Sequence, residues 1–352
     1  MGFTVEEFTW ENLPRPRNQA YRRFAFPLAC ARQLLAAQRR GHSYHAAIIH
    51  EPSGAAVALI RRLRITQTRL VVVSHNPEQK VWELNKSLTE VSGHRIPWRT
   101  RLLWPVTRLW QSNLALRWAD HVLCLSTEDQ AFLAERFAIP SHRLSRTHNG
   151  VESHFFDITA DYRRPRLLFM GSWLTHKGID TLRRAIPELL ERHAGLLVTL
   201  AGVGMPESMV RSHFPTSLQP RMRVLSAIAP EALSALYSQH NIFVLPSWYE
   251  GMPLSLLEAM AAGLSVTASA VGGIQDVVRH ERDGLLVPPR DLPALTTALS
   301  RLAGCSDLRG RMGRAARERA RAFSWHSAVQ TIAAAASLRV ATTASATNRE
   351  AA

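Results

Sequence analysis

The stretch Asn241–Gly273 reads N-I-F-V-L-P-S-W-Y-E-G-M-P-L-S-L-L-E-A-M-A-A-G-L-S-V-T-A-S-A-V-G-G. Its apolar run Ile242–Pro246 predicts a buried strand. Pro253 should open a helix that Gly263 ends, because proline suits the first helical turn and glycine the position after the last. A second strand is predicted over Ser265–Ala270. Strand, helix and strand in this order indicate a parallel sheet covered by helices.

Two carboxylates lie on either side of this strand-to-helix corner. Glu250 falls on the loop and Glu258 about one turn into the helix, eight residues later. Both can face one cleft at the carboxyl end of the strand, where open α/β sheets bind their ligands. The first amides of the helix suit a phosphate or another anion, because they have no partner within the helix. These amides belong to Gly251, Met252, Leu254 and Ser255.

The rest of the chain repeats the alternation of strands and helices. We therefore predict an α/β fold of two Rossmann-like doubly wound domains that face each other across a cleft. The predicted boundaries are 1–160 for the N-terminal domain, 161–325 for the C-terminal domain, and 326–352 for a helix and a disordered tail. In the N-terminal half, Val5–Phe8 is predicted as a strand, and His75 follows the strand Leu70–Ser74.

Composition and charge limit the classes of function. The chain has 352 residues with a formal net charge of +15, and residues 1–150 contain 21 Lys and Arg against 11 Asp and Glu. Such a balance favours an anionic partner, or it reflects an arginine-rich proteome. Three isolated cysteines argue for a reducing compartment, and the histidines show no metal-ligand spacing. The first fifteen residues hold three Glu, so no signal peptide is expected.

The motifs P-S-x-x-E-G, E-A-M-A-x-G and V-G-G occur in fixed order within residues 246–273. A further motif, L-L-F-M-G-S-W-L-T-H-K-G-I-D, occupies residues 167–180. Together they resemble the donor site of retaining glycosyltransferases of family 4 (group 1), which have the GT-B fold. The resemblance covers residues 3–335. The pieces H-N-G-V (148–151) and F-S-W (323–325) agree with the same family and are expected to serve its architecture.

The resemblance implies roles for individual residues. Glu258 would bind the ribose hydroxyls of a nucleotide sugar, and Glu250 would lie beside the transferred sugar. Lys177 would neutralise the diphosphate, and His75 would contact the donor sugar near the reacting centre. Ser172 stands where the family usually has a second phosphate-binding arginine. The remaining residues expected to bind the donor are Gly171, Gly251, Met252, Pro253 and Leu254.

The expected function is transfer of a sugar from a nucleotide-sugar co-substrate to an acceptor hydroxyl with retention. No metal and no other cofactor are expected. A glycan or lipid-linked acceptor would place the enzyme in bacterial cell-surface polysaccharide or glycolipid synthesis, on the cytoplasmic side. The alternatives are a sugar-nucleotide epimerase of similar fold and a truncated, non-catalytic relative that binds sugar nucleotides. Nucleic-acid binding is not expected, because the sequence carries no module for it.

The N-terminus departs from the family. Members of the family normally begin with a strand and a glycine-rich turn, yet no glycine lies between Gly2 and Gly41. We therefore expect the N-terminal domain to lack its first strand, either through a misplaced start codon, which we favour, or because the chain is a truncated relative.

Residues 96–118 interleave tryptophans with arginines at near-helical spacing. Such a pattern suits the headgroup layer of an anionic membrane, which would make the enzyme peripheral on the inner face of the plasma membrane. It equally describes a helix that packs on its own domain with its tryptophans in the core, and this interpretation is slightly favoured. Pro105 is expected to interrupt the helix. The four tryptophans are Trp98, Trp104, Trp110 and Trp118.

Overall fold

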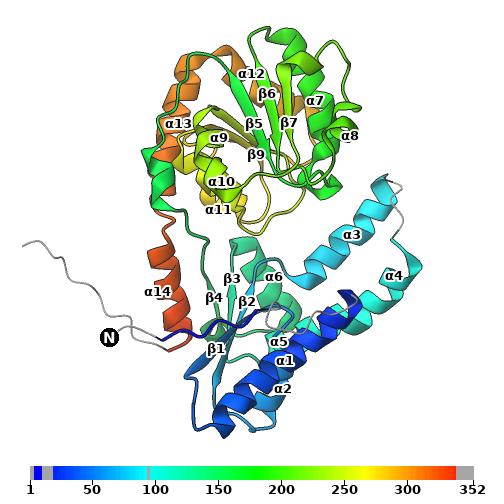
Figure 1. The fold of residues 1–352 in the computed structure, drawn as a ribbon, viewed down its shortest axis with the longest axis vertical. Coiled ribbons are helices and arrows are strands. Elements are labelled where there is room, and N and C mark those ends of the chain that lie inside the picture. The colour runs from blue at the N-terminus through cyan, green and yellow to red at the C-terminus, as the bar shows by residue number, and fades with distance from the viewer. Residues whose placement is uncertain (1–3, 10–18, 93–95, 338–352) are drawn as a thin grey trace, which may run out of the picture. The chain divides into compact units, whose positions relative to one another are not determined.

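A computed structural model of the chain describes residues 4–9, 19–92 and 96–337, which form two compact units (Figure 1). The sequence predicts domain boundaries after residues 160 and 325. In the structure, the chain passes between the two units at 147/148 and at 328/329. Residues 338–352, predicted as a disordered tail, lie outside the described residues. Unit 1 comprises Met1–Leu125, Asp129–Thr147 and Val329–Ala352, and unit 2 comprises Ser126–Glu128 and His148–Ala328.

The sheet of unit 1 is parallel and has the strand order β1-β2-β3-β4 among the described residues. These strands are β1 (Ala46–His50), β2 (Arg69–Ser74), β3 (His121–Cys124) and β4 (Leu144–Arg146). Val5–Phe8, predicted as a strand, has no strand structure. The segment pairs with no described strand, and a short local sequence cannot by itself supply a partner strand.

Both faces of this sheet are covered, because side chains along a strand alternate between them. Leu70 and Val72 pack toward the core that α1, α2, α5 and α6 share. Val71 and Val73 pack on the opposite face, against the end of α14. The helices are α1 (Gln19–Arg39), α2 (Ala55–Arg62), α5 (Trp110–Trp118), α6 (Thr127–Phe137) and α14 (Trp325–Ala335).

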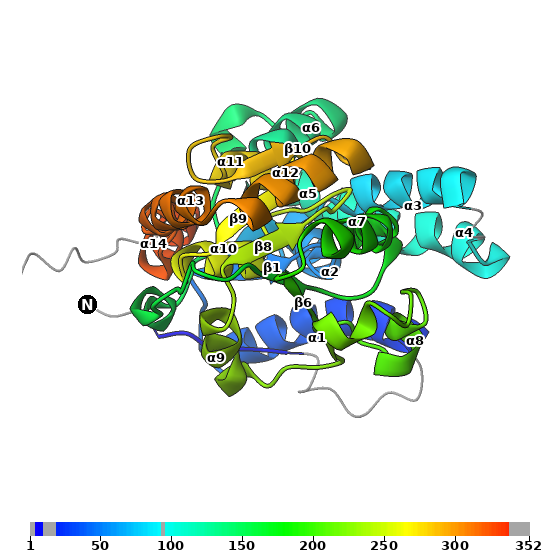
Figure 2. The same cartoon turned by 90° about the horizontal axis from the view of Figure 1, so that it is seen from above.

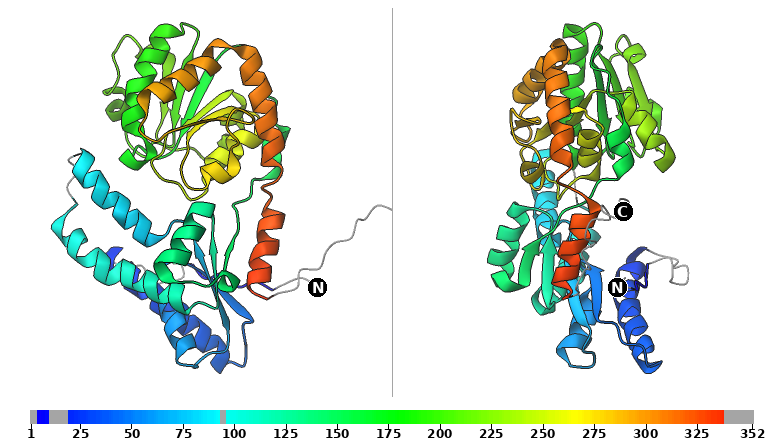
Figure 3. Two further views of the ribbon diagram at one scale, coloured as in Figure 1. Left: turned by 180° about the vertical axis from the view of Figure 1, so that it is seen from behind. Right: turned by 90° about the vertical axis from the view of Figure 1, so that its left-hand side faces the viewer.

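Unit 1 also carries a helical arm that leads away from its sheet, formed by α3 (Glu78–Ser92) and α4 (Trp98–Trp104) side by side (Figure 3). The predicted interruption at Pro105 is wrong. The helix continues from α4 into α5 through the π-helical turn η2 (Pro105–Leu109). A wider turn accommodates proline because its nitrogen cannot donate the usual backbone hydrogen bond. Among the described residues, no helix is long and apolar enough to cross a membrane.

Unit 2 contains a parallel six-stranded sheet of order β10-β9-β8-β5-β6-β7. Helices α7 and α12 lie along one face, and α9 and α10 along the other (Figure 2). The predicted α/β class with parallel sheets is therefore confirmed. The strands are β5 (Arg166–Met170), β6 (Leu197–Ala201), β7 (Met222–Leu225), β8 (Ile242–Leu245), β9 (Ser265–Ser269) and β10 (Leu285–Val287).

The described residues of unit 2 form seven α-helices. They are α7 (Ile179–Arg192), α8 (Glu207–Arg211), α9 (Leu233–Ser238), α10 (Leu254–Ala261), α11 (Ile274–Val277), α12 (Leu292–Gly304) and α13 (Ser306–Ala320). The switch in strand order falls beside β5 and β8, the two central strands. Ligands of open α/β sheets bind outside the carboxyl ends of strands at such a point.

Candidate functional site

The carboxyl ends of β5 and β8 bring Lys177 and Glu250 together. Lys177 Nζ lies 2.7 Å from Glu250 Oε1, and the Ser247 hydroxyl donates to the same oxygen at 2.7 Å. The Glu250 side chain is buried, whereas that of Lys177 keeps 23% of its surface exposed. We call Lys177, Ser247 and Glu250 the lysine–glutamate cluster. Glu250 holds the Lys177 ammonium at one place, and part of the Lys177 side chain stays exposed to a ligand.

Local backbone geometry fixes the position of Lys177. Gly178 has a left-handed φ of +75°, and a Cβ at this residue would lie 1.8 Å from the Pro246 carbonyl oxygen. The Trp248 amide donates to the His176 carbonyl oxygen at 2.8 Å. The turn before α7 is therefore fastened to the loop after β8. Lys177 lies in a short 3-10 turn, and α7 begins two residues later, at Ile179.

The predicted glycine turn packs on the loop that carries Glu250. The Gly273 amide donates to the Gly251 carbonyl oxygen at 2.7 Å. A Cβ on Gly272 would lie 1.8 Å from the Glu250 carbonyl oxygen. The Glu128 carboxylate accepts a hydrogen bond from the Gly272 amide at 2.8 Å. Glycines are needed here because two backbone segments approach more closely than any side chain allows.

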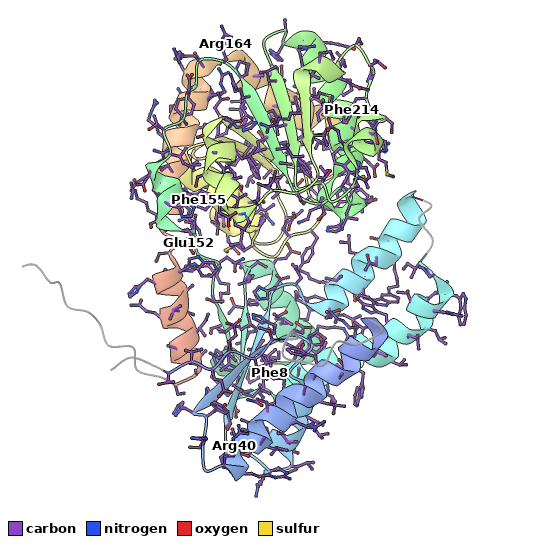
Figure 4. All side chains as sticks on the ribbon, viewed as in Figure 1. Phe8, Arg40, Glu152, Phe155, Arg164 and Phe214 are labelled. Carbon is purple, nitrogen blue, oxygen red and sulfur yellow. The ribbon has the colours of Figure 1, made fainter. Side chains whose placement is uncertain are left out.

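Glu258 has a different partner, so the two predicted carboxylates belong to separate hydrogen-bonding groups. The Tyr237 hydroxyl donates to Glu258 Oε2 at 2.8 Å, and the Tyr237 ring packs edge-on against Phe155, whose position is labelled in Figure 4. Burial and the neighbouring carboxylate raise the pKa of Tyr237 well above its usual value, so it remains a donor. Burial raises the pKa of Glu258, and the hydrogen bond from Tyr237 lowers it again.

The remaining residues predicted to bind the donor lie close to these groups. Pro253 caps the N-terminus of α10, Leu254 is its first residue, and Gly251 and Met252 are buried just before it. The Asn149 side chain donates to the Met252 carbonyl oxygen at 2.7 Å, which fixes this turn. Gly171 follows β5, and a Cβ there would lie 4.0 Å from the Lys177 side chain.

His75 lies in unit 1, after β2, and pairs with a second histidine. Its Nε2 atom is 2.8 Å from His50 Nδ1, and the rings stack with centroids 4.7 Å apart. Partial desolvation lowers the pKa of both imidazoles, and the charge of His50 lowers that of His75 further. When both rings are neutral, one ring N–H donates a hydrogen bond to the unprotonated nitrogen of the other. The catalytic role of His75 stays a prediction.

Sequence inspection missed a buried carboxyl beside this pair. Glu51 follows β1 and accepts hydrogen bonds from the Ser74 and Ser112 hydroxyls and from the Glu78 amide. Burial raises the pKa of Glu51 to about 7. The one feature of the sequence that could have pointed to Glu51 is its position directly after a strand. The carboxyl ties the ends of β1 and β2 to α3 and α5.

Replacing Glu51 by glutamine should stabilise unit 1 at alkaline pH. A carboxyl whose pKa rises on folding keeps its proton in the folded state after the unfolded chain has lost its own. The wild type therefore loses stability as the pH rises from about 4.5 to 7, by an amount on the order of 3 kcal/mol. Thermal unfolding at pH 5 and pH 8 should show this loss in the wild type and in the surface control Glu135→Gln, but not in Glu51→Gln. Parallel pH profiles for all three proteins would contradict it.

The family-like pieces at 148–151 and 323–325 pack on each other, far apart in sequence. The Val151 amide donates to the Phe323 carbonyl oxygen at 3.0 Å, and the His148 ring meets the Phe323 ring edge-on. A Cβ on Gly150 would lie 2.4 Å from Trp325. Sequence reasoning also missed Tyr237, which no motif marks, and the role of Ser247, although the motif P-S-x-x-E-G contains it.

Comparisons with known proteins agree with the fold described above. Residues 164–304 match a family model described as glycosyl transferases group 1, and residues 3–155 match one described as glycosyltransferase family 4. An MMP alpha-(1->4)-mannosyltransferase of Mycolicibacterium hassiacum is 29% identical over 92% of this chain and 76% of its own. The chain spans only about half the length of several other curated relatives that it matches.

Solved structures show the same fold. A sucrose-phosphate synthase from Thermosynechococcus elongatus has a TM-score of 0.72 at 24% identity, and the match covers 91% of this chain and 79% of that one. HepE of Anabaena, solved in complex with UDP-glucose, has a TM-score of 0.66 at 17% identity, with 87% and 81% covered.

Proposed function

Because this chain belongs to the group 1 and family 4 glycosyltransferases of the GT-B fold, we propose that it transfers a sugar from a nucleotide-sugar donor to an acceptor hydroxyl. The proposed transfer retains the anomeric configuration and needs no metal ion and no cofactor besides the donor. The acceptor is a glycan or a lipid-linked glycan of the bacterial cell surface. The binding of UDP-glucose by HepE supports a nucleotide sugar as donor.

The lysine–glutamate cluster is the observation that best supports this proposal. Departure of a nucleoside diphosphate places negative charge on the phosphate oxygens, which an oriented ammonium and helix amides stabilise. Lys177 supplies the ammonium, and Glu250 and Ser247 hold it in place. Since Glu250 is already paired with a cation, its second oxygen can accept hydrogen bonds from sugar hydroxyls. We assign it this binding role and not that of a covalent nucleophile.

Glu258 would bind the vicinal hydroxyls of the ribose, because a carboxylate accepts two hydrogen bonds at once. Tyr237 acts as its positioning residue. Burial raises the pKa of Glu258, and the hydrogen bond that the Tyr237 hydroxyl donates to one carboxylate oxygen opposes this rise, which favours the ionised form. The ribose would then use the remaining lone pairs.

Replacing Tyr237 by phenylalanine should weaken donor binding most at acidic pH. Loss of the hydrogen bond raises the pKa of Glu258, so the carboxyl becomes protonated at a higher pH and accepts hydrogen bonds poorly. We expect the KM for the donor to rise roughly tenfold at pH 6 and less at pH 8, with kcat little changed. Steady-state kinetics at both pH values test this. Tyr162→Phe, which removes a hydroxyl that donates to the Gly263 carbonyl oxygen, serves as the control. An equal rise at both pH values would reject the positioning role.

Product analysis tests the proposed function itself. The purified chain is incubated with nucleotide sugars and a lipid-linked or oligosaccharide acceptor, with and without EDTA. We expect a glycosylated product whose anomeric proton coupling matches the donor configuration, at a rate that EDTA does not change. Conversion of the donor without an acceptor would instead identify an epimerase. Donor binding without turnover for any acceptor would identify a non-catalytic binding protein.

A further inference from the structure

The helix that runs from α4 through η2 into α5 exposes a line of large apolar side chains. Trp98 and Trp110 keep 69% and 57% of their surfaces exposed. Trp98, Leu102, Val106 and Trp110 recur every four residues, which places them one above another along a helix, and Leu103 directly follows Leu102. We call the following set the Trp98–Trp110 stripe: Trp98, Leu102, Leu103, Val106 and Trp110, all exposed.

The other two tryptophans of this segment point inward. Trp104 stacks on Trp82 of α3, with ring centroids 6.1 Å apart, and Trp118 packs against the core of unit 1. The expectation that the tryptophans form the core is therefore wrong for Trp98 and Trp110, while Trp104 and Trp118 are partly buried against their own unit. The arm already has its own internal packing, so the stripe is not needed to hold it to the unit.

Within residues 96–118 the charged side chains have a single sign. Residues 96–118 contain four arginines and no acidic residue. Arg99 and Arg101 are exposed beside the stripe, and the Arg99 guanidinium lies 5.4 Å from the centroid of the Trp98 ring. Arg108 is ion-paired with Glu78 and contributes less. Exposed tryptophan beside unpaired arginine is the combination that favours the headgroup layer of an anionic bilayer.

We propose that the Trp98–Trp110 stripe docks this protein on an anionic lipid surface. The helix lies parallel to the membrane plane, with the apolar side chains among the upper acyl carbons and the arginines at the lipid phosphates. Twelve helical steps give the stripe a length of about 18 Å. This docking does not depend on the proposed sugar transfer, because it uses no residue of the donor site.

A second copy of this chain is the main competing occupant. A two-fold contact brings the same patch of both copies together. Here it would bring two arginine-bearing segments together, with no acidic residue in either segment to compensate. Like charges in a closing interface cost free energy, whereas lipid phosphates neutralise them. The charge pattern thus favours lipid.

Vesicle flotation tests the proposal. The full chain is mixed with phosphatidylcholine vesicles that contain either no anionic lipid or about one-third phosphatidylglycerol. We expect flotation only with the anionic vesicles, and loss of it at high salt. The double variant Trp98→Ser/Trp110→Ser should reduce the bound fraction roughly tenfold or more. Arg99→Gln/Arg101→Gln should reduce binding at low salt. Leu63→Ser, which removes an equally exposed apolar side chain of unit 1, is the matched control and should float like the wild type.

Three outcomes would overturn the proposal. One is equal flotation of the wild type and the double tryptophan variant. Another is no flotation of the wild type at low salt. The third is a wild-type dimer in light scattering that the double variant converts to a monomer, with no lipid binding by either, which would assign the stripe to self-association. Unchanged thermal unfolding of each variant shows that the fold is intact. A failure of sugar transfer would leave these results unaffected.

Discussion

Replacing Lys177 by alanine should lower kcat/KM for sugar transfer about a hundredfold or more, because the departing diphosphate loses its oriented cation. The same change leaves the buried Glu250 carboxylate with only the Ser247 hydroxyl among the partners described for it. The variant should therefore also lose the rise in melting temperature that a nucleoside diphosphate gives the wild type. Steady-state kinetics and a thermal-shift titration measure the two effects.

Two further variants show whether the Lys177–Glu250 pair binds the diphosphate or only supports the fold. Lys86→Ala removes an exposed lysine of α3 and should behave like the wild type. Glu250→Gln leaves Lys177 uncompensated, so a nucleoside diphosphate should bind as tightly as before or more tightly, while transfer falls at least about tenfold. Equal loss of diphosphate binding in Lys177→Ala and Glu250→Gln would mean that the pair only supports the fold.

Replacing Gly178 by alanine should destabilise unit 2 by about 3 kcal/mol or more. The added Cβ would lie 1.8 Å from the Pro246 carbonyl oxygen, and the residue must also keep a φ of +75°. Either the turn before α7 separates from the loop after β8, or the backbone is forced out of its conformation. Both responses move Lys177, so transfer should fall along with stability. Chemical denaturation and transfer rates measure the two losses.

Gly204→Ala provides a control that isolates steric overlap from backbone strain. Gly204 has a similar φ of +71°, yet nothing lies within 4 Å of a Cβ placed there. Its replacement should cost only about 1 kcal/mol, the usual penalty for a left-handed alanine. If Gly178→Ala and Gly204→Ala unfold alike, the close contact between the two loops does not exist in solution.

Part of the candidate site could be predicted because its residues are close in sequence. Glu250, the glycine turn and the start of α10 lie within one strand–turn–helix–strand segment. Local rules for proline, glycine and apolar runs fix the direction of such a segment. Lys177 could be added because parallel strands present all their carboxyl ends at one edge of a sheet. Strand β2 was predicted to within one residue of its observed start, because a continuous apolar run marks a strand that is buried on both faces.

Long-range packing decided the rest. Tyr237 reaches Glu258 across 21 residues, and Phe155 supports its ring from another segment. The second face of the unit 1 sheet is covered by the end of α14, from the opposite end of the chain. No local pattern records such partners, because many distant segments could supply an equally apolar surface or a hydroxyl.

Residues 96–118 also show that a local sequence pattern does not predict the partners of a side chain. The sequence by itself determined that tryptophans and arginines share a helix, since spacing and charge are properties of the chain. Only the tertiary structure decided which tryptophans are covered, because that depends on where α3 and the sheet lie. Trp104 stacks on Trp82 and is partly buried, whereas Trp98 and Trp110 are exposed to solvent. The sequence specifies a side chain's chemistry, and its neighbours in space determine how that chemistry is used.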